Sequence, residues 1–205
     1  MRKTVYLGDL LQSAWPRMMI ENEVLKAIRE RRSILIFRPE PLEDEKIEAV
    51  LDAGRWAPSF GNSQPWEFIV VKDQFRREKL SDLTARVSII HKGIRGAPVI
   101  IVVCVDPRKD SSHFIEDGAV ATQNMALAAH SLGLASYWVG IFNPRDEKGS
   151  IEREVKKFLN IPNEYRVIAF LPIGIRAYDP PTQTRKSLRE ITHYDQHGSR
   201  PTDTV

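Results

Sequence analysis

The sequence predicts a single α+β domain in which helices cover both faces of a small sheet. Segments with helical periodicity alternate with short β-branched runs along most of the 205 residues. Hydrophobic residues make up 42% of the chain and charged residues 28%, a balance typical of globular proteins and unlike that of disordered ones. The chain contains neither an internal repeat nor a linker between two folded segments. We therefore expect one hydrophobic core.

Two helices are expected first. Asn22 can cap a helix over residues 22–32 whose apolar residues share one face. Two prolines then favour an extended connection, and a second helix, which begins with acidic residues, is expected at residues 43–56. The residues of this second helix expected to face inward are Ile47, Val50, Leu51 and Trp56.

Strands and helices alternate in the rest of the chain. Strands are expected at residues 66–72, 97–105, 134–141 and 166–175, and helices at residues 74–86, 112–132 and 150–160. The run at 97–105 is β-branched and continuous, which is typical of a buried central strand. The helix at 112–132 can be capped by Ser111 or Ser112 and ends before Gly133. Because it is rich in Ala and Met, we expect it to be buried and to let another helix approach closely.

The net charge is +3, and its distribution favours a compact anion over a long polyanion such as nucleic acid. Residues 29–38 carry +3 and residues 181–190 carry +2, so the rest of the chain carries −2. The longest apolar run, Val99–Val105, is too short to span a bilayer, which argues against a membrane partner. The single cysteine, Cys104, is expected to pack in the core and fits a reducing, cytoplasmic location.

Two basic clusters could bind an anion. Arg31, Arg32 and Ser33 offer two guanidiniums and a hydroxyl to a phosphate, although the dipole of a helix also favours basic residues in its last turn. Arg185 and Lys186 form a second cluster, for which a solvated charge run is the alternative. No pattern predicts a metal site, because the histidines at 193 and 197 belong to a polar tail.

A third feature is the loop at residues 57–68. Its Asn62 and Gln64 side chains offer paired donors and acceptors that suit the polar edge of a planar heterocycle. The alternative is a turn that ends a helix and precedes a buried Trp66.

These features occur together, in this order, in the FMN-dependent nitroreductase family, which the chain resembles from about Glu21 to Tyr194. The matching pieces are Arg31-Arg32-Ser33, the loop 57–68, Ala97-Pro98, the helix 119–133 with Gln123-Asn124, and residues 137–140, 171–174 and 185–188.

The resemblance implies a three-layer α/β/α sandwich with a small mixed sheet, in an intertwined homodimer whose two FMN sites lie between the subunits. It implies a domain at residues 21–194. The residues at the two ends lack the periodic pattern of the domain, so we expect an N-terminal arm at 1–20 and a polar tail at 195–205. The residues implied for the phosphate and ribityl side are Arg31, Arg32, Ser33 and Arg185. From the other subunit, Pro58, Ser59 and Asn62 would reach the ring. Trp138, Val139 and Gly140 would place backbone groups near its reactive middle.

The chain departs from the family pattern at three positions. Leu35 stands where the family usually carries Arg or Lys, and the missing cation is expected to lower the flavin potential unless Arg38 or another group substitutes. Gln183 stands where a basic residue is frequent, and Tyr137 where Cys is frequent.

The resemblance also implies an activity. Hydride would pass from NADH or NADPH to flavin N5, and a nitroaromatic, quinone or similar small acceptor would then take the electrons in a ping-pong cycle. No catalytic side chain is assigned, because the cofactor carries the chemistry. A dehalogenase-type flavoenzyme on the same fold and a non-enzymatic flavin-binding sensor remain alternatives, and Leu35 keeps the sensor alternative open.

Overall fold

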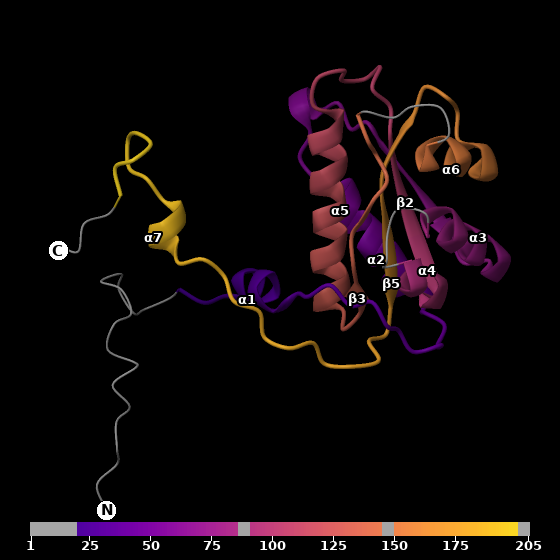
Figure 1. Cartoon of the computed structure of the whole chain (residues 1–205), viewed down its shortest axis with the longest axis horizontal. Helices are drawn as coiled ribbons and strands as arrows, with labels where there is room; N and C mark the ends of the chain where they lie inside the picture. The colour runs from indigo at the N-terminus through magenta and orange to yellow at the C-terminus, as the bar shows by residue number, and fades with distance from the viewer. Residues whose placement is uncertain (1–19, 86–90, 145–149, 201–205) are drawn as a thin grey trace, which may run out of the picture. The chain divides into compact units, whose positions relative to one another are not determined.

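In the computed structural model, residues 20–85, 91–144 and 150–200 are described, and they belong to two compact units (Figure 1). The larger unit spans residues 23–180 and holds the sheet. The smaller unit comprises the described residues of the two chain ends, 20–22 and 181–200. Nearly all of the predicted N-terminal arm lies outside the described residues, so the expected boundaries at residues 21 and 194 stay predictions.

The predicted helices are present with small shifts of their ends, and three short helices are additional. The expected ones are α1 (Glu23–Glu30), α2 (Asp44–Arg55), α3 (Gln74–Thr84), α5 (Phe114–Ser131) and α6 (Ile151–Leu159). The additional ones are η2 (Phe60–Asn62), α4 (His91–Gly96) and, in the smaller unit, α7 (Leu188–Ile191). Asp73 and Ser150 cap α3 and α6 through their side-chain oxygens, as short polar residues do before a helix.

The sheet has five strands, whose order is β1-β2-β5-β3, with β4 also paired to β5. Their bounds are β1 (Trp66–Val71), β2 (Val99–Val105), β3 (Ala135–Ser136), β4 (Val139–Gly140) and β5 (Arg166–Gly174). These strands pair antiparallel, and the parallel contribution in the described part of the chain is the isolated bridge between Ser33 and Ser136. The predicted α+β class with helices on both sides of a small sheet is confirmed.

Strand β2 shows how the layers form, since all seven of its residues are buried and successive side chains point to opposite faces. Ile100, Val102 and Cys104 join a core cluster with residues of α3, α4 and α6. The alternate residues of β2 join a second cluster with residues of α2 and α5. Figure 1 shows the same arrangement, with α2 and α5 on one side of the sheet and α3, α4 and α6 on the other.

Three sequence expectations need correction. Helix α5 begins at Phe114 after His113, which makes no side-chain cap, because the backbone of Ser112 is still part of a turn held by Asp110. Trp56 is 72% exposed because it follows the last residue of α2, and the Arg55 guanidinium lies over its ring. The strand expected at 134–141 is divided into β3 and β4.

Other details agree with the sequence. Gly133 ends α5 with a φ of +77°, and its N–H donates to the carbonyl of His130 at 3.0 Å. Cys104 is buried in β2, and burial, with help from the charges of Glu67 and Glu152, raises the pKa of its thiol to about 12. The described residues contain no helix with the length and apolar character needed to cross a membrane.

Candidate functional site

The basic segment Arg31–Ser33 lies against the short strands that precede β5. Ser33 forms a parallel bridge with Ser136, and the N–H of Ile34 donates to the Ser136 carbonyl at 3.1 Å. Two further backbone hydrogen bonds pair the following residues with the chain after β5. The N–H of Arg38 donates to the Ile175 carbonyl, and the N–H of Ala177 donates to the Ile36 carbonyl. The segment therefore lies beside the residues that lead from β3 to β4, which the sequence analysis also selected.

Trp138, Val139 and Gly140 form the exposed edge of this region. Val139 is buried and pairs with Phe170, whereas Trp138 is 39% exposed and Gly140 is exposed. A Cβ atom at Gly140 would have as its nearest neighbour the indole nitrogen of Trp138, at 3.6 Å. The backbone of this edge is thus open to a flat ligand, while the Val139 side chain anchors it to the core.

Tyr137 also anchors this edge to the core. Its side chain is buried, its ring stacks on that of Phe37 with centroids 6.2 Å apart, and burial raises the pKa of its hydroxyl. A Cβ atom at Gly93 of α4 would lie 2.7 Å from both the Tyr137 hydroxyl and the Leu35 carbonyl oxygen. Gly93 thus lets α4 touch both segments of the site at once.

The surroundings of Arg31 and Arg32 are electropositive. His130, in the last turn of α5, has its pKa lowered by burial and by the charges of Arg31, Arg176 and Arg32, with Glu30 opposing them. Arg32 also donates to the carbonyls of Arg29 and Arg31, at 3.0 Å for the latter, and so satisfies the end of α1. These contacts support the dipole interpretation of this cluster, and its anion-binding role stays a prediction.

Arg176 and His130 adjoin the basic segment in the structure, and neither residue was predicted from the sequence. Arg176 follows β5 and is brought to the basic segment by its antiparallel bridge to Phe37. Its guanidinium also pairs with Asp179 at 3.1 Å. No motif marks either residue, because each contact joins distant parts of the chain: Phe37 and Arg176 are 139 residues apart, and Glu30 and His130 are 100 apart. The isolated bridge places Arg176 there, and the 4.0 Å distance between the His130 ring and the Glu30 carboxylate places His130 there.

The loop that carries Pro58, Ser59 and Asn62 lies at the other edge of the sheet, next to β1. It contacts the first turn of α5, where Asp117 accepts a hydrogen bond from the N–H of Phe60 at 3.1 Å. The basic segment instead adjoins the last turn of α5, where His130 lies 4.0 Å from Glu30. The two contact points are 13 residues apart on α5, or about 20 Å along its axis. One chain does not bring these two groups of predicted residues together.

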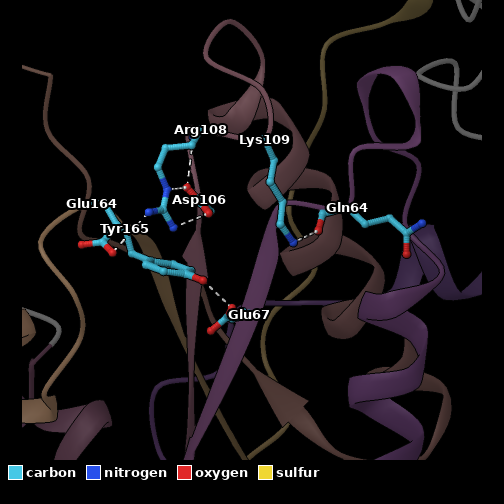
Figure 2. A network of polar contacts seen from close by, with 7 residues as sticks. All are labelled: Gln64, Glu67, Asp106, Arg108, Lys109, Glu164 and Tyr165. Carbon is cyan, nitrogen blue, oxygen red and sulfur yellow. Dashed lines mark hydrogen bonds and ion pairs between the residues drawn. The ribbon is translucent and has the colours of Figure 1, made fainter.

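Next to this loop, a polar network ties the ends of β1, β2 and β5 together (Figure 2). Arg108 forms two 2.8 Å hydrogen bonds with the buried Asp106 and reaches Glu164 at 3.4 Å. The Tyr165 hydroxyl donates to Glu67 at 2.5 Å. Lys109 donates to the carbonyl of Gln64 at 3.3 Å and so fixes the end of the loop.

The Tyr165 hydroxyl also shows the electrostatic effect of this network. Its hydrogen bond to the Glu67 carboxylate, together with burial and the charge of Glu67, raises the pKa of Tyr165 to about 12.

Arg185 belongs to the smaller unit, where it is exposed and donates to the Thr184 carbonyl at 2.9 Å. Its role beside Arg31 stays a prediction. The His193 and His197 rings lie 4.4 Å apart, and His193 accepts from the Gly198 N–H at 3.0 Å. Within the described residues there is no group of three or more His, Cys, Asp or Glu side chains that could hold a metal ion.

Known proteins resemble this chain both in sequence and in structure. A protein of Archaeoglobus fulgidus, provisionally named NADH dehydrogenase/NAD(P)H nitroreductase, is 37% identical over 155 residues, which cover 74% of this chain and 84% of that protein. The structure of an FMN-dependent nitroreductase from Clostridium difficile R20291 has a TM-score of 0.77 at 27% identity, and the match covers 84% of this chain and 99% of that one.

A third similar protein was solved with the cofactor. The structure of a provisionally named nitroreductase from Desulfovibrio desulfuricans in complex with FMN has a TM-score of 0.69 at 31% identity, covering 86% of this chain and 99% of that one. The family model of the Nitroreductase family matches residues 28–90 and 85–175. Because the family model matches most of the larger unit and the Archaeoglobus relative is 37% identical, the chain belongs to the Nitroreductase family.

Proposed function

We propose that this chain is an FMN-dependent oxidoreductase that uses NADH or NADPH to reduce a nitroaromatic, quinone or similar small acceptor. The observation that carries the proposal is the backbone pairing of Ser33 with Ser136, which sets a basic segment beside the open edge at residues 138–140. The names of the Archaeoglobus and Clostridium relatives support the reaction class and the cofactor.

The residues fit FMN on two counts. A phosphate dianion matches the electropositive surroundings of Arg31 and Arg32, whose charges already disfavour a proton on His130. A planar ring matches the edge formed by Trp138 and Gly140, where the nearest neighbour of an added Cβ is 3.6 Å away. Arg31, Arg32 and Ser33 would hold the phosphate and ribityl side, and Trp138, Val139 and Gly140 would line the ring.

When bound, FMN would supply the chemistry by accepting a hydride from the nicotinamide and then reducing the acceptor. The chain contributes binding and orientation: the arginines neutralise the phosphate, and the buried Val139 and Tyr137 keep the edge rigid. We assign no catalytic side chain. Donor and acceptor would use one open edge in turn, which predicts ping-pong kinetics.

A homodimer completes the proposal. Pro58, Ser59 and Asn62 lie at the β1 edge, about one α5 length from the basic segment of the same chain. A second copy would bring its own loop to the first copy's basic segment. The apolar face of α1, with Val24 65% and Ile28 51% exposed, offers surface for such a contact. We further propose a reducing, cytoplasmic location, in keeping with the buried lone thiol.

Leu35 sets the expected redox behaviour. Its side chain packs partly buried against the core, and Arg38 is exposed and pairs with Glu40 at 3.9 Å. We therefore propose a lower flavin potential than in relatives with a cation at this position. Replacing Leu35 with Lys should raise the midpoint potential, and an unchanged potential would contradict this role.

The test of the function uses the purified full chain. Its visible spectrum should show bound flavin, which NADH or NADPH should bleach without oxygen and an added quinone should restore. Arg32→Gln should weaken FMN affinity by about tenfold or more, because a charge-assisted contact to phosphate is lost. Arg153 is exposed on α6, so Arg153→Gln is the matched control and should leave the FMN affinity unchanged. A protein that takes up no FMN would overturn the proposal, and intersecting initial-rate lines would overturn the ping-pong scheme.

A further inference from the structure

We propose that Asp117, in the first turn of α5, is a positioning residue for the flavin site. Its carboxylate holds the loop of residues 58–64, from which Pro58, Ser59 and Asn62 would reach FMN. The role of the loop in FMN binding rests on the proposed function. The contact between Asp117 and the loop rests on hydrogen bonds within the chain itself.

Three residues of the loop have left-handed backbone conformations, which only some residue types adopt readily. Gly61, Asn62 and Gln64 all have left-handed φ values, of +57°, +56° and +46°. Gly61 adopts this region freely and Asn62 does so more readily than most residues, whereas Gln64 is of a type that rarely adopts it. The strained Gln64 backbone favours outside contacts that keep this shape, and backbone conformations of this kind cluster at functional sites.

Contacts within the loop are local. The N–H of Gln64 donates to the Ser59 hydroxyl oxygen at 3.0 Å, and the N–H of Asn62 donates to the Ser59 carbonyl at 3.1 Å. The Gln64 and Asn62 side chains bond to each other at 3.2 Å. These bonds define the turn, but they do not fix it relative to the rest of the fold.

Asp117 supplies the contact between the middle of the loop and a rigid element. One of its carboxylate oxygens accepts from the N–H of Phe60 at 3.1 Å, and the other lies 3.4 Å from the Ser63 hydroxyl that donates to it. The two bonded residues flank Gly61 and Asn62, so the carboxylate spans the left-handed segment. The Phe60 ring stacks on His113, with centroids 4.1 Å apart, at the start of the same helix.

The carboxylate itself is held in place. Asp117 is only 5% exposed, and it lies in the first turn of α5, where the helix dipole favours a negative charge. The next residue, Gly118, sits so close to the sheet that a Cβ atom would lie 2.6 Å from Ile168 and 3.0 Å from Val105. Helix α5 therefore cannot move closer to the sheet. The hydrogen bonds of Asp117 hold the loop against this fixed helix.

The affinity for FMN depends on how often the loop adopts its binding conformation. If only a fraction of the molecules has the loop in the binding conformation, the apparent dissociation constant of FMN rises by the inverse of that fraction. Asp117→Asn removes the charge, so neither contact remains charge-assisted, and it leaves a single acceptor oxygen for the Phe60 N–H and the Ser63 hydroxyl. We expect the apparent dissociation constant of FMN to rise about tenfold.

The experiment compares the wild-type chain with Asp117→Asn and with a matched control, Glu152→Gln. Glu152 is likewise buried, at 3% exposure, and likewise accepts a backbone N–H, from Val167 at 2.8 Å, but it joins α6 to β5. Each protein is measured for thermal stability, for FMN affinity by fluorescence quenching, and for hydrogen exchange of the Phe60 amide without cofactor.

We expect both variants to lose stability, but only Asp117→Asn to weaken FMN binding and to speed exchange at Phe60 by about tenfold. Equal FMN affinity and equal exchange in Asp117→Asn and wild type would overturn the inference. If Asp117→Asn does not fold, Ser63→Ala replaces it, since it removes one of the two contacts from a half-buried position. A wild-type chain that binds no FMN would overturn the proposed function, and the exchange of Phe60 would still decide whether Asp117 holds the loop.

Discussion

Gly93 offers a sharp test of how α4 supports the candidate site. A methyl group added there would lie 2.7 Å from the Leu35 carbonyl oxygen and 2.7 Å from the Tyr137 hydroxyl. Leu35 and Tyr137 belong to the two segments that Ser33 and Ser136 join. Because the carbonyl is backbone and the Tyr137 ring is buried, neither neighbour can move aside easily. Gly93→Ala should therefore displace both segments.

The expected magnitude combines two opposing effects. Overpacking of a filled interior costs about 1–3 kcal/mol, and alanine in place of glycine within a helix returns up to about 1 kcal/mol. We expect Gly93→Ala to lower the free energy of unfolding by about 1–2 kcal/mol. Gly96 in the same helix is the matched control, since a Cβ atom there would meet open space within the described part of the chain. Gly96→Ala should be neutral or stabilising by up to about 1 kcal/mol.

Urea unfolding followed by circular dichroism measures both variants against wild type. A difference of about 2 kcal/mol between them corresponds to about 4–8 °C in melting temperature for a chain of this size. If the proposed site is correct, Gly93→Ala should also bind FMN more weakly, and Gly96→Ala should not. Equal stability of the two variants would refute the reasoning, because it would show that the site segments yield to a methyl group.

Three further predictions concern titratable groups. The Cys104 thiol, whose pKa is raised to about 12 by burial first of all, should be inert to Ellman's reagent in the native protein and should react fully in denaturing guanidinium chloride. Tyr165 should titrate at about 12 in the ultraviolet difference spectrum, and Glu67→Gln should bring this pKa down toward 10.0; an unchanged value would contradict the assigned hydrogen bond. The pKa of His130 in the folded chain is lowered below 6.5, so the unfolded chain takes up a proton at a higher pH than the folded chain does. The free energy of unfolding should therefore fall as the pH drops below about 6.5. His130→Gln should flatten this part of the curve, and in NMR titrations a bound phosphate dianion should raise the pKa of His130.

Several elements could be predicted from local sequence because one short-range rule decides each of them. Strand β2 follows from an unbroken β-branched run, α6 from Ser150 as its cap, and the end of α5 from Gly133. Burial of Cys104 follows from its place in that run. These features depend on backbone geometry and side-chain periodicity within about ten residues, which the sequence displays directly.

Other features depend on which surfaces meet. Trp56 looked like a helix residue that faces the core, but α2 ends one residue earlier and leaves the ring exposed. The apolar run at 134–141 looked like one strand, but pairing with Ser33 and with β5 divides it around Trp138. Periodicity gives the amphipathic character of a segment, and only its neighbours decide how much of it is covered.

The sequence by itself determined the fold class, the basic segment at 31–33 and the specialised loop at 57–68, because each is written in contiguous residues. Only the tertiary structure showed that Arg176 and His130 adjoin the basic segment, that Asp117 holds the loop, and that loop and segment lie at opposite ends of α5. The physical reason is chain topology. Contacts between residues far apart in sequence form when helices and strands pack, and no local pattern records which of them will meet.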